Sequence, residues 1–178
     1  MPGKLRVVQL RTLRGDITAI DVDAVVNAAN GALRRGSGVC GAIFAGAGPQ
    51  LDEACAAVGG CATGDAVATP GFDLPARWVI HAVGPVWEGG DDDEADLLAS
   101  CYRRVIEVAA EIGARTVAIP ALSTGVYGFP ADGAAEIAMA TLRSIAPAVA
   151  ASVDEVTLVA FDDETHRRYE WRLEGGTS

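Results

Sequence analysis

The stretch that decides the fold is Val25-Val26-Asn27-Ala28-Ala29-Asn30-Gly31, followed by Gly36-Ser37-Gly38-Val39-Cys40-Gly41-Ala42-Ile43. An apolar strand runs into two asparagines, and a glycine-rich turn then leads into a helix of small residues. Such a turn presents backbone N–H groups and a helix N-terminus to an anion, while asparagine amides can reach hydroxyl groups. A similar stretch is Ile119-Pro120-Ala121-Leu122-Ser123-Thr124-Gly125-Val126-Tyr127-Gly128. Together the two stretches predict a clamp for one phosphorylated ligand.

Strands and helices alternate along the rest of the chain. Apolar runs predict strands over residues 5–10, 24–28, 66–69, 78–83, 116–119 and 156–161. Helical periodicity predicts helices over residues 41–47, 49–58, 97–112 and 163–171, and one more that Asp132 caps and Pro147 ends. The alternation predicts an α/β fold, a three-layer α/β/α sandwich with a central mixed, mostly parallel sheet. Ligands of such sheets bind at the carboxyl ends of strands, where both glycine-rich stretches fall.

Composition limits the partners of the chain. Its 178 residues carry a formal net charge of −10, which argues against binding to nucleic acid or to anionic membranes. A small anion remains acceptable, because backbone N–H groups supply positive potential without lysine. We expect one domain over residues 1–173 and a disordered tail over residues 174–178.

The apolar, cysteine and histidine patterns indicate the cellular compartment and bear on metal binding. No long apolar run begins the chain, so we expect neither a signal peptide nor a transmembrane helix. With two histidines in the chain and no Cys-x-x-Cys pair, a metal site is not expected either. Reduced thiols in a cytoplasm are the simplest interpretation of the four cysteines, Cys40, Cys55, Cys61 and Cys101. His81 lies inside an apolar strand pattern and is expected to be a core histidine with a hydrogen-bonded ring.

Several motifs, taken in order, resemble the macrodomain family. Gly15-Asp16-Ile17-Thr18 precedes the two asparagines, and Thr63-Gly64-Asp65-Ala66, Val79-Ile80-His81-Ala82-Val83-Gly84-Pro85 and Ser123-Thr124-Gly125-Val126-Tyr127-Gly128 follow them. Each motif is weak alone, but the ordered set runs from about residue 5 to about residue 172 and is specific. The likeness is to the MacroD-type branch. It implies a domain that binds ADP-ribose and often hydrolyses ADP-ribose conjugates, with no cofactor.

The resemblance implies that adenine is held where the first and last strands end. Asp16 would accept a hydrogen bond from the adenine amino group, and the N–H of Ile17 would meet the ring. The alternative for Asp16 is a turn aspartate that caps the segment after it. Phe161 would stack on adenine, with core packing as the alternative.

The resemblance places the diphosphate and the distal ribose between the two glycine-rich stretches. Asn30 would hold and orient the distal ribose, because an amide both donates to and accepts from hydroxyl groups. Asn27 is expected mainly to shape the loop through bonds to neighbouring backbone, and Tyr127 to lie against the distal ribose or, alternatively, in the core. The expected contact residues of the two stretches are Ala29, Gly38, Val39, Cys40, Gly41, Ser123, Thr124, Gly125, Val126 and Tyr127.

Cys40 departs from the family pattern. MacroD-type hydrolases have an aspartate at this place, and they tend to have histidine where this chain has Phe44. A thiol is a poor substitute for a carboxylate, and we expect it to stay neutral at pH 7 because a nearby diphosphate opposes its ionisation. Hydrolysis would then be substrate-assisted, with a diphosphate oxygen holding the water and the loops fixing its geometry.

The sequence thus predicts a monomeric hydrolase that removes ADP-ribosyl groups from acidic side chains of proteins or from O-acetyl-ADP-ribose, with Asn30 as the catalytic residue. The rival prediction is a non-catalytic module that reads ADP-ribose, which Cys40 favours. A nucleic-acid-binding module conflicts with the acidity of the chain.

Overall fold

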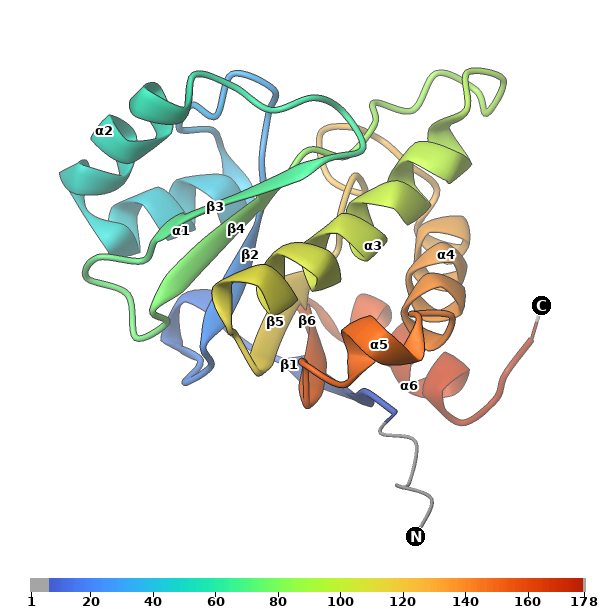
Figure 1. The fold of residues 1–178 in the computed structure, drawn as a ribbon. Coiled ribbons are helices and arrows are strands. Elements are labelled where there is room, and N and C mark those ends of the chain that lie inside the picture. Colours follow the sequence, from blue (N-terminus) through green and yellow to red (C-terminus); the bar gives the residue numbers. More distant parts are fainter. Residues whose placement is uncertain (1–6, 178) are drawn as a thin grey trace, which may run out of the picture.

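A computed structural model describes residues 7–177 and contains a six-stranded sheet between two groups of helices (Figure 1). The spatial order of the strands is β1-β6-β5-β2-β4-β3. β3 runs antiparallel to β4, and the other four neighbouring pairs are parallel. The strands are β1 (Gln9–Arg14), β2 (Ala24–Ala28), β3 (Ala66–Pro70), β4 (Trp78–Ala82), β5 (Thr116–Pro120) and β6 (Glu155–Ala160). The predicted mixed, mostly parallel sheet is confirmed.

Alternate residues of the central strands belong to two separate hydrophobic cores, one on each face of the sheet. Val25 and Val79 pack with α1 (Gly38–Ala47), α2 (Pro49–Val58) and the short helix η1 (Ile17–Ala19). Val26 and Ile80 belong to the opposite core. Because both faces are buried, these strands appear in the sequence as continuous apolar runs. The helices on the second side are α3 (Glu94–Ile112), α4 (Ala131–Arg143), α5 (Pro147–Ala150) and α6 (Asp163–Leu173).

The first strand lies later in the chain than predicted. The prediction was residues 5–10, of which residues 5 and 6 lie outside the described residues, whereas β1 spans Gln9–Arg14. β1 is an edge strand whose Arg11 and Arg14 form ion pairs with Glu155 and Asp163. These charged side chains conceal the strand from a search for apolar runs.

Four helix ends also differ from the prediction. α1 begins at Gly38 rather than at residue 41, and α3 begins at Glu94 rather than at residue 97. Asp132 does not cap α4, because it lies in the first turn and accepts a hydrogen bond from Arg168. Pro147 does not end α4, which stops at Arg143; it instead begins α5, a first-turn position that proline favours.

After α6 the chain folds back on the helix. The backbone N–H groups of Gly175 and Gly176 donate to carbonyl oxygens of the last helical turns, and Ser178 lies outside the described residues. The expected domain boundary and disordered tail stay predictions. Within residues 7–177, none of the helices combines the length and the apolar character needed to cross a membrane.

Candidate functional site

A cavity of about 280 Å³ opens where β2, β4 and β5 end. It lies between residues 30–41, called the first loop and including the first turn of α1, and residues 121–128, called the second loop. The structure therefore brings together two segments that are far apart in the sequence. The predicted contact residues that line the cavity are Ala29, Asn30, Gly38, Val39, Cys40, Ser123, Gly125, Val126 and Tyr127.

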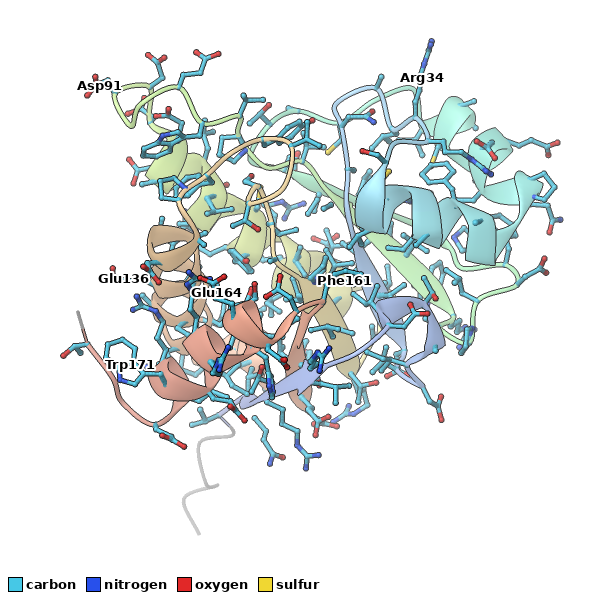
Figure 2. All side chains as sticks on the ribbon, turned by 180° about the vertical axis from the view of Figure 1, so that it is seen from behind. Arg34, Asp91, Glu136, Phe161, Glu164 and Trp171 are labelled. Carbon is cyan, nitrogen blue, oxygen red and sulfur yellow. The ribbon has the colours of Figure 1, made fainter. Side chains whose placement is uncertain are left out.

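Side chains hold the first loop in shape. The Asn30 amide closes a ring with Arg34: its Nδ2 donates to the Arg34 carbonyl oxygen at 2.8 Å, and its Oδ1 accepts from the Arg34 N–H at 3.0 Å. The Cys40 thiol donates to the same carbonyl at 3.7 Å. The Arg34 side chain itself extends into solvent (Figure 2), and Arg35 is paired with Asp52 at 3.3 Å.

The first turn of α1 presents free donors to the cavity. Ser37 precedes the helix without a side-chain cap, and the first turn has no acidic residue. The first N–H groups of a helix have no intrahelical partner, so an uncapped start facing a cavity is suited to an anion. Gly38 stands at a φ of 60°, a left-handed conformation that glycine adopts without strain.

Gly41 allows α1 to pack closely against the first loop. A Cβ at Gly41 would lie 2.7 Å from the carbonyl oxygen of Gly36, so the helix can approach the loop only with glycine there. Gly41 is not among the residues that line the cavity. Its predicted contact with a ligand stays a prediction.

The second loop contains a strained residue with an unpaired hydroxyl group. Ser123 has a φ of 63°, and its Oγ is buried without a hydrogen-bond partner among the described residues. Sequence reasoning gave no role to Gly84, yet a Cβ there would lie 2.1 Å from this Oγ. Strain and unpaired polar atoms tend to occur at functional sites. In the sequence, the only indication that Gly84 matters is its place directly after an apolar strand.

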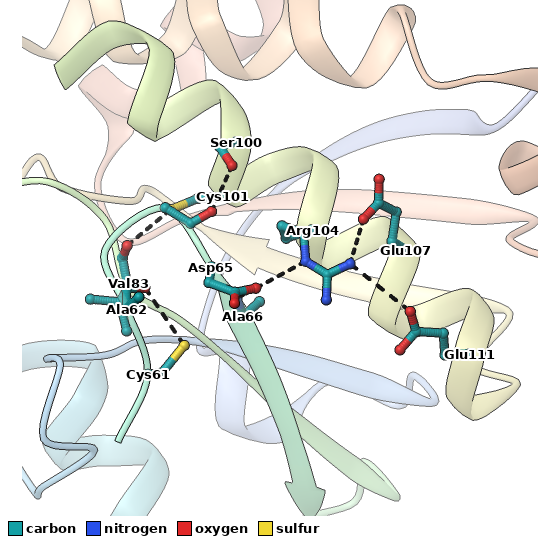
Figure 3. Close-up of polar contacts among 11 residues, drawn as sticks. Cys61, Ala62, Asp65, Ala66, Val83, Ser100, Cys101, Arg104, Glu107 and Glu111 are labelled. Carbon is teal, nitrogen blue, oxygen red and sulfur yellow. Dashed lines mark hydrogen bonds and ion pairs between the residues drawn. The ribbon is translucent and has the colours of Figure 1, made fainter. Parts of the chain in front are cut away.

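A polar network on α3 fixes the segment before Gly84 (Figure 3). Arg104 Nε donates to Asp65 Oδ1 at 2.9 Å, and Arg104 also pairs with Glu107. The Val83 carbonyl accepts from Gly64 N at 2.8 Å and from Cys101 Sγ at 3.0 Å. The motif at residues 63–66 thus joins β3 and β4 to α3 and serves the scaffold beneath the cavity.

Thr124 lies apart from the main cavity. It lines a separate void of about 10 Å³ together with Tyr102 and Tyr169, between α3, α4 and α6. Tyr127, by contrast, is half-buried and lines the main cavity, so the alternative of a core aromatic is wrong.

The residues predicted for adenine lie next to the cavity rather than in its lining. Asp16 and Phe161 follow the neighbouring strands β1 and β6, where Gly15 N donates to the Ala160 carbonyl. Phe161 is 85% exposed, so the alternative of core packing is wrong (Figure 2). Asp16 caps η1 by accepting from the hydroxyl and the N–H of Thr18, and these bonds hold the pKa of its carboxyl below the usual value. Ile17 is buried in the core that contains α1.

Behind the cavity lies a buried polar pair. Asn27 does not bond neighbouring backbone as expected: its Nδ2 contacts His81 Nδ1 at 3.1 Å and Cys40 Sγ at 3.7 Å. The parallel register of β2 and β4 places Asn27 beside His81, a pairing that the sequence does not reveal. The prediction of a core histidine is confirmed, because His81 is fully buried and both ring nitrogens have partners. Burial lowers its pKa to about 4.

Among residues 7–177, no three His, Cys, Asp or Glu side chains gather in a way that could hold a metal ion. The cavity itself is lined by one thiol, one amide and hydroxyl groups, and none of its lining residues is a carboxylate. Its lining therefore offers neutral hydrogen-bonding groups.

The fold and the cavity define an α/β domain with a cavity at the carboxyl ends of its parallel strands. Residues 26–138 match the Macro domain family, and the chain belongs to that family. A Macro domain-containing protein of Lactiplantibacillus plantarum is 50% identical over 94% of this chain and 97% of its own. A protein of Enterobacter cloacae named O-acetyl-ADP-ribose deacetylase is 49% identical over 91% of this chain and 92% of its own.

Solved structures of other macrodomains have the same fold. The Oceanobacillus iheyensis macrodomain with ADP is 36% identical, covers 98% of this chain and 94% of its own, and superposes with a TM-score of 0.87. The Trypanosoma brucei macrodomain in complex with ADP-ribose is also 36% identical, covers 97% of this chain and 72% of its own, and has a TM-score of 0.87.

Proposed function

We propose that this chain binds ADP-ribose and hydrolyses ADP-ribosyl esters, either on acidic side chains of modified proteins or in O-acetyl-ADP-ribose. The observation that carries the proposal is the cavity between the two loops. The uncapped start of α1 lines it from the first loop, and Ser123, whose Oγ is buried and unpaired among the described residues, lines it from the second. Relatives named O-acetyl-ADP-ribose deacetylase and macrodomains solved with ADP or ADP-ribose support it.

The size of the cavity fits part of this ligand. A volume of about 280 Å³ lies just below the usual range for sites that enclose a whole drug-sized molecule. The diphosphate and the distal ribose would occupy the cavity. Adenine would extend along the edge of the sheet, between exposed Phe161 and the turn of Asp16 and Ile17.

Asn30 would serve as the residue that orients the distal ribose. Each of its amide atoms already bonds Arg34, but Nδ2 has a second proton and Oδ1 a second lone pair. The ring with Arg34 fixes the amide plane before the ligand arrives, so these free positions are aimed in advance. Preorganisation of this kind lowers a barrier by positioning alone.

Cys40 would take no part as a base. Its thiol accepts from Asn27 Nδ2 and donates to the Arg34 carbonyl, so both its hydrogen-bonding roles are in use. With no carboxylate in the cavity lining, the group that holds the attacking water would be a diphosphate oxygen of the substrate itself. No metal takes part in this scheme. The predicted cytoplasmic location, the monomeric state and the lack of binding to nucleic acid and membranes stay predictions.

Two measurements test the proposal. Calorimetry should detect ADP-ribose binding at micromolar affinity or tighter, about −8 kcal/mol, and much weaker binding of AMP, which lacks the second phosphate and the distal ribose. Incubation with a mono-ADP-ribosylated protein and with O-acetyl-ADP-ribose should release ADP-ribose slowly. No heat with ADP-ribose would refute the whole proposal.

The second candidate function is a reader module that binds ADP-ribose without turnover. The cavity lining favours it in one respect, because Cys40 stands where a carboxylate would otherwise be and no other carboxylate replaces it. Tight binding of ADP-ribose combined with no release from any ADP-ribosyl ester would establish the reader.

A further inference from the structure

His81 is a buried, titratable side chain that the proposed function does not use. It is fully buried, does not line the cavity, and lies in β4 between β2 and β3. Its Nε2 is 2.9 Å from Thr69 Oγ1 and 3.7 Å from Cys55 Sγ, and its Nδ1 is 3.1 Å from Asn27 Nδ2. The ring thus connects β3 on one side with β2 on the other.

The contacts assign a direction to these hydrogen bonds. The Thr69 hydroxyl donates to the Pro70 carbonyl at 3.3 Å, so its oxygen is left to accept from His81 Nε2–H. Nδ1 is then the unprotonated nitrogen and accepts from Asn27 Nδ2. With this assignment, both ring nitrogens of neutral His81 have a hydrogen-bond partner.

The series of hydrogen bonds continues from the same Asn27 amide nitrogen into the first loop. Nδ2 also donates to Cys40 Sγ at 3.7 Å, and Cys40 Sγ donates to the Arg34 carbonyl at 3.7 Å. That carbonyl is the acceptor of the Asn30 amide at 2.8 Å. A single line of hydrogen bonds therefore runs from Thr69 on β3 to the residue expected to orient the distal ribose.

Asn27 is the weak point of this line. It is fully buried, and its Oδ1 has no hydrogen-bond partner among the described residues, so the side chain is fixed only through Nδ2. If His81 stopped accepting, a buried amide would lose one of its two contacts, and the orientation of the other would no longer be set.

We propose that His81 is a positioning residue of the ligand cavity: in its neutral form it orients Asn27, which holds the Cys40 side chain and so the junction of the first loop with α1. Its effect on a ligand rests on the function proposed above. Its effect on Cys40 does not, because the hydrogen bonds exist in the structure without a ligand.

The surroundings of His81 keep it neutral. The groups that face the ring are Thr69 from β3, Asn27 from β2, Cys55 from α2 and the Phe44 ring from α1 at a centroid distance of 6.5 Å. Burial raises the pKa of the Cys55 thiol to about 11, so this neighbour carries no charge at pH 7. Burial also lowers the pKa of His81 to about 4, and Nδ1 therefore remains an acceptor at neutral pH.

The first arm of the test determines the tautomer. The chain has two histidines, so the imidazole ¹⁵N spectrum is assigned with one variant, His166→Gln. We expect His81 to be neutral at pH 7, with its proton on Nε2. A proton on Nδ1 would overturn the proposal, because Nδ1 could not then accept from Asn27.

The second arm measures the position of Cys40 by its rate of alkylation with iodoacetamide, without any ligand. Thr69→Val removes the acceptor of Nε2–H at the far end of the line, and His81→Phe removes the ring nitrogens. We expect Cys40 to react about fivefold faster in Thr69→Val, the factor that corresponds to one ordinary hydrogen bond. Thr157→Val, at another buried strand threonine, is the matched control and should leave the rate unchanged.

The third arm measures the ADP-ribose dissociation constant of the same variants, which we expect to rise about fivefold in Thr69→Val, in line with the alkylation rates. If the wild type does not bind ADP-ribose, the proposed function fails while the first two arms still decide the positioning role. Unchanged Cys40 reactivity in Thr69→Val and in His81→Phe, with both variants folded by circular dichroism, would overturn the inference.

Discussion

The two loops on either side of the cavity are held by different means. In the first loop, side chains add to the backbone bonds: Asn30 bonds Arg34 twice, and Cys40 bonds it once. In the second loop, two backbone bonds close the turn, with Gly128 N donating to Gly125 O and Phe129 N to Ser123 O. Trp87 N donates to Tyr127 O and attaches this loop to the segment before α3.

This difference determines how each loop responds to amino-acid substitutions. A loop held by side chains loses one bond at a time when those side chains are shortened. A loop held by its backbone is insensitive to most side chains, as the 88% exposure of Val126 indicates, but it depends on the close fit of Ser123 against Gly84. Substitutions in each loop should therefore have different consequences for binding and for stability.

Replacing a glycine by valine should abolish ADP-ribose binding in either loop, but it should lower the stability of the protein only in the first loop. Gly38 has a φ of 60°, whereas a Cβ at Gly125 meets no atom within 4 Å and the backbone there is not left-handed. Gly38→Val should therefore also lower the free energy of unfolding, by about 1–2 kcal/mol, while Gly125→Val should not. Calorimetry and urea unfolding of the two variants provide the comparison. Normal binding by Gly125→Val would place the ligand elsewhere.

Gly84→Ala should raise the ADP-ribose dissociation constant about 100-fold, or about 2.7 kcal/mol. The new Cβ would lie 2.1 Å from Ser123 Oγ, so this hydroxyl must leave its buried position or the backbone that carries it must shift, and either change alters the cavity wall. Gly133→Ala on α4, where a Cβ has only an ordinary 3.7 Å contact, is the matched control and should bind normally. Normal affinity in Gly84→Ala would show that the position of Ser123 does not matter to the ligand.

In single-turnover hydrolysis, Asn30→Ala should slow release of ADP-ribose at least about tenfold, roughly the loss of an oriented hydrogen bond together with the ring to Arg34. Cys40→Ala should keep most of the rate at saturating substrate, because the thiol serves only as a structural link, and its ADP-ribose dissociation constant should rise about as much as in Thr69→Val. Cys40→Asp restores a carboxylate and is expected to speed the reaction if binding survives the added charge. Complete loss of activity in Cys40→Ala, with binding intact, would make the thiol catalytic.

The smallest effect concerns the segment that braces the second loop. The Glu94 carboxylate accepts from the backbone N–H groups of Glu88, Gly90 and Asp92, and these bonds, against the opposing effect of burial, lower its pKa from 4.5 to about 2. Because the folded-state pKa is the lower one, its stabilising contribution is present above about pH 4.5 and is lost as the pH falls towards 2. Glu94→Gln should therefore flatten the dependence of unfolding free energy on pH between these values. An unchanged acid profile in this variant would contradict the role of Glu94.

The chain's own pattern determined a large part of the fold. The apolar run at residues 24–28 became β2, and the helix expected over residues 49–58 became α2 with the same bounds. The two glycine-rich stretches were found because a strand, a turn and a helix follow one another locally in each. The predictions were weakest at β1, where Arg11 and Arg14 interrupt the apolar pattern, and at helix starts, where glycine and charged residues conceal the first turn.

Local sequence sets the segments and the hydrogen-bond donors that each can offer, because propensity, periodicity and turn chemistry act over a few neighbouring residues. The tertiary structure alone decided which of these groups meet. The register of β2 and β4 brings Asn27 beside His81, and the end of β4 brings Gly84 against Ser123. It also left Phe161 exposed next to the turn of Asp16. These contacts join distant parts of the chain through packing and strand register, and no local pattern carries that information.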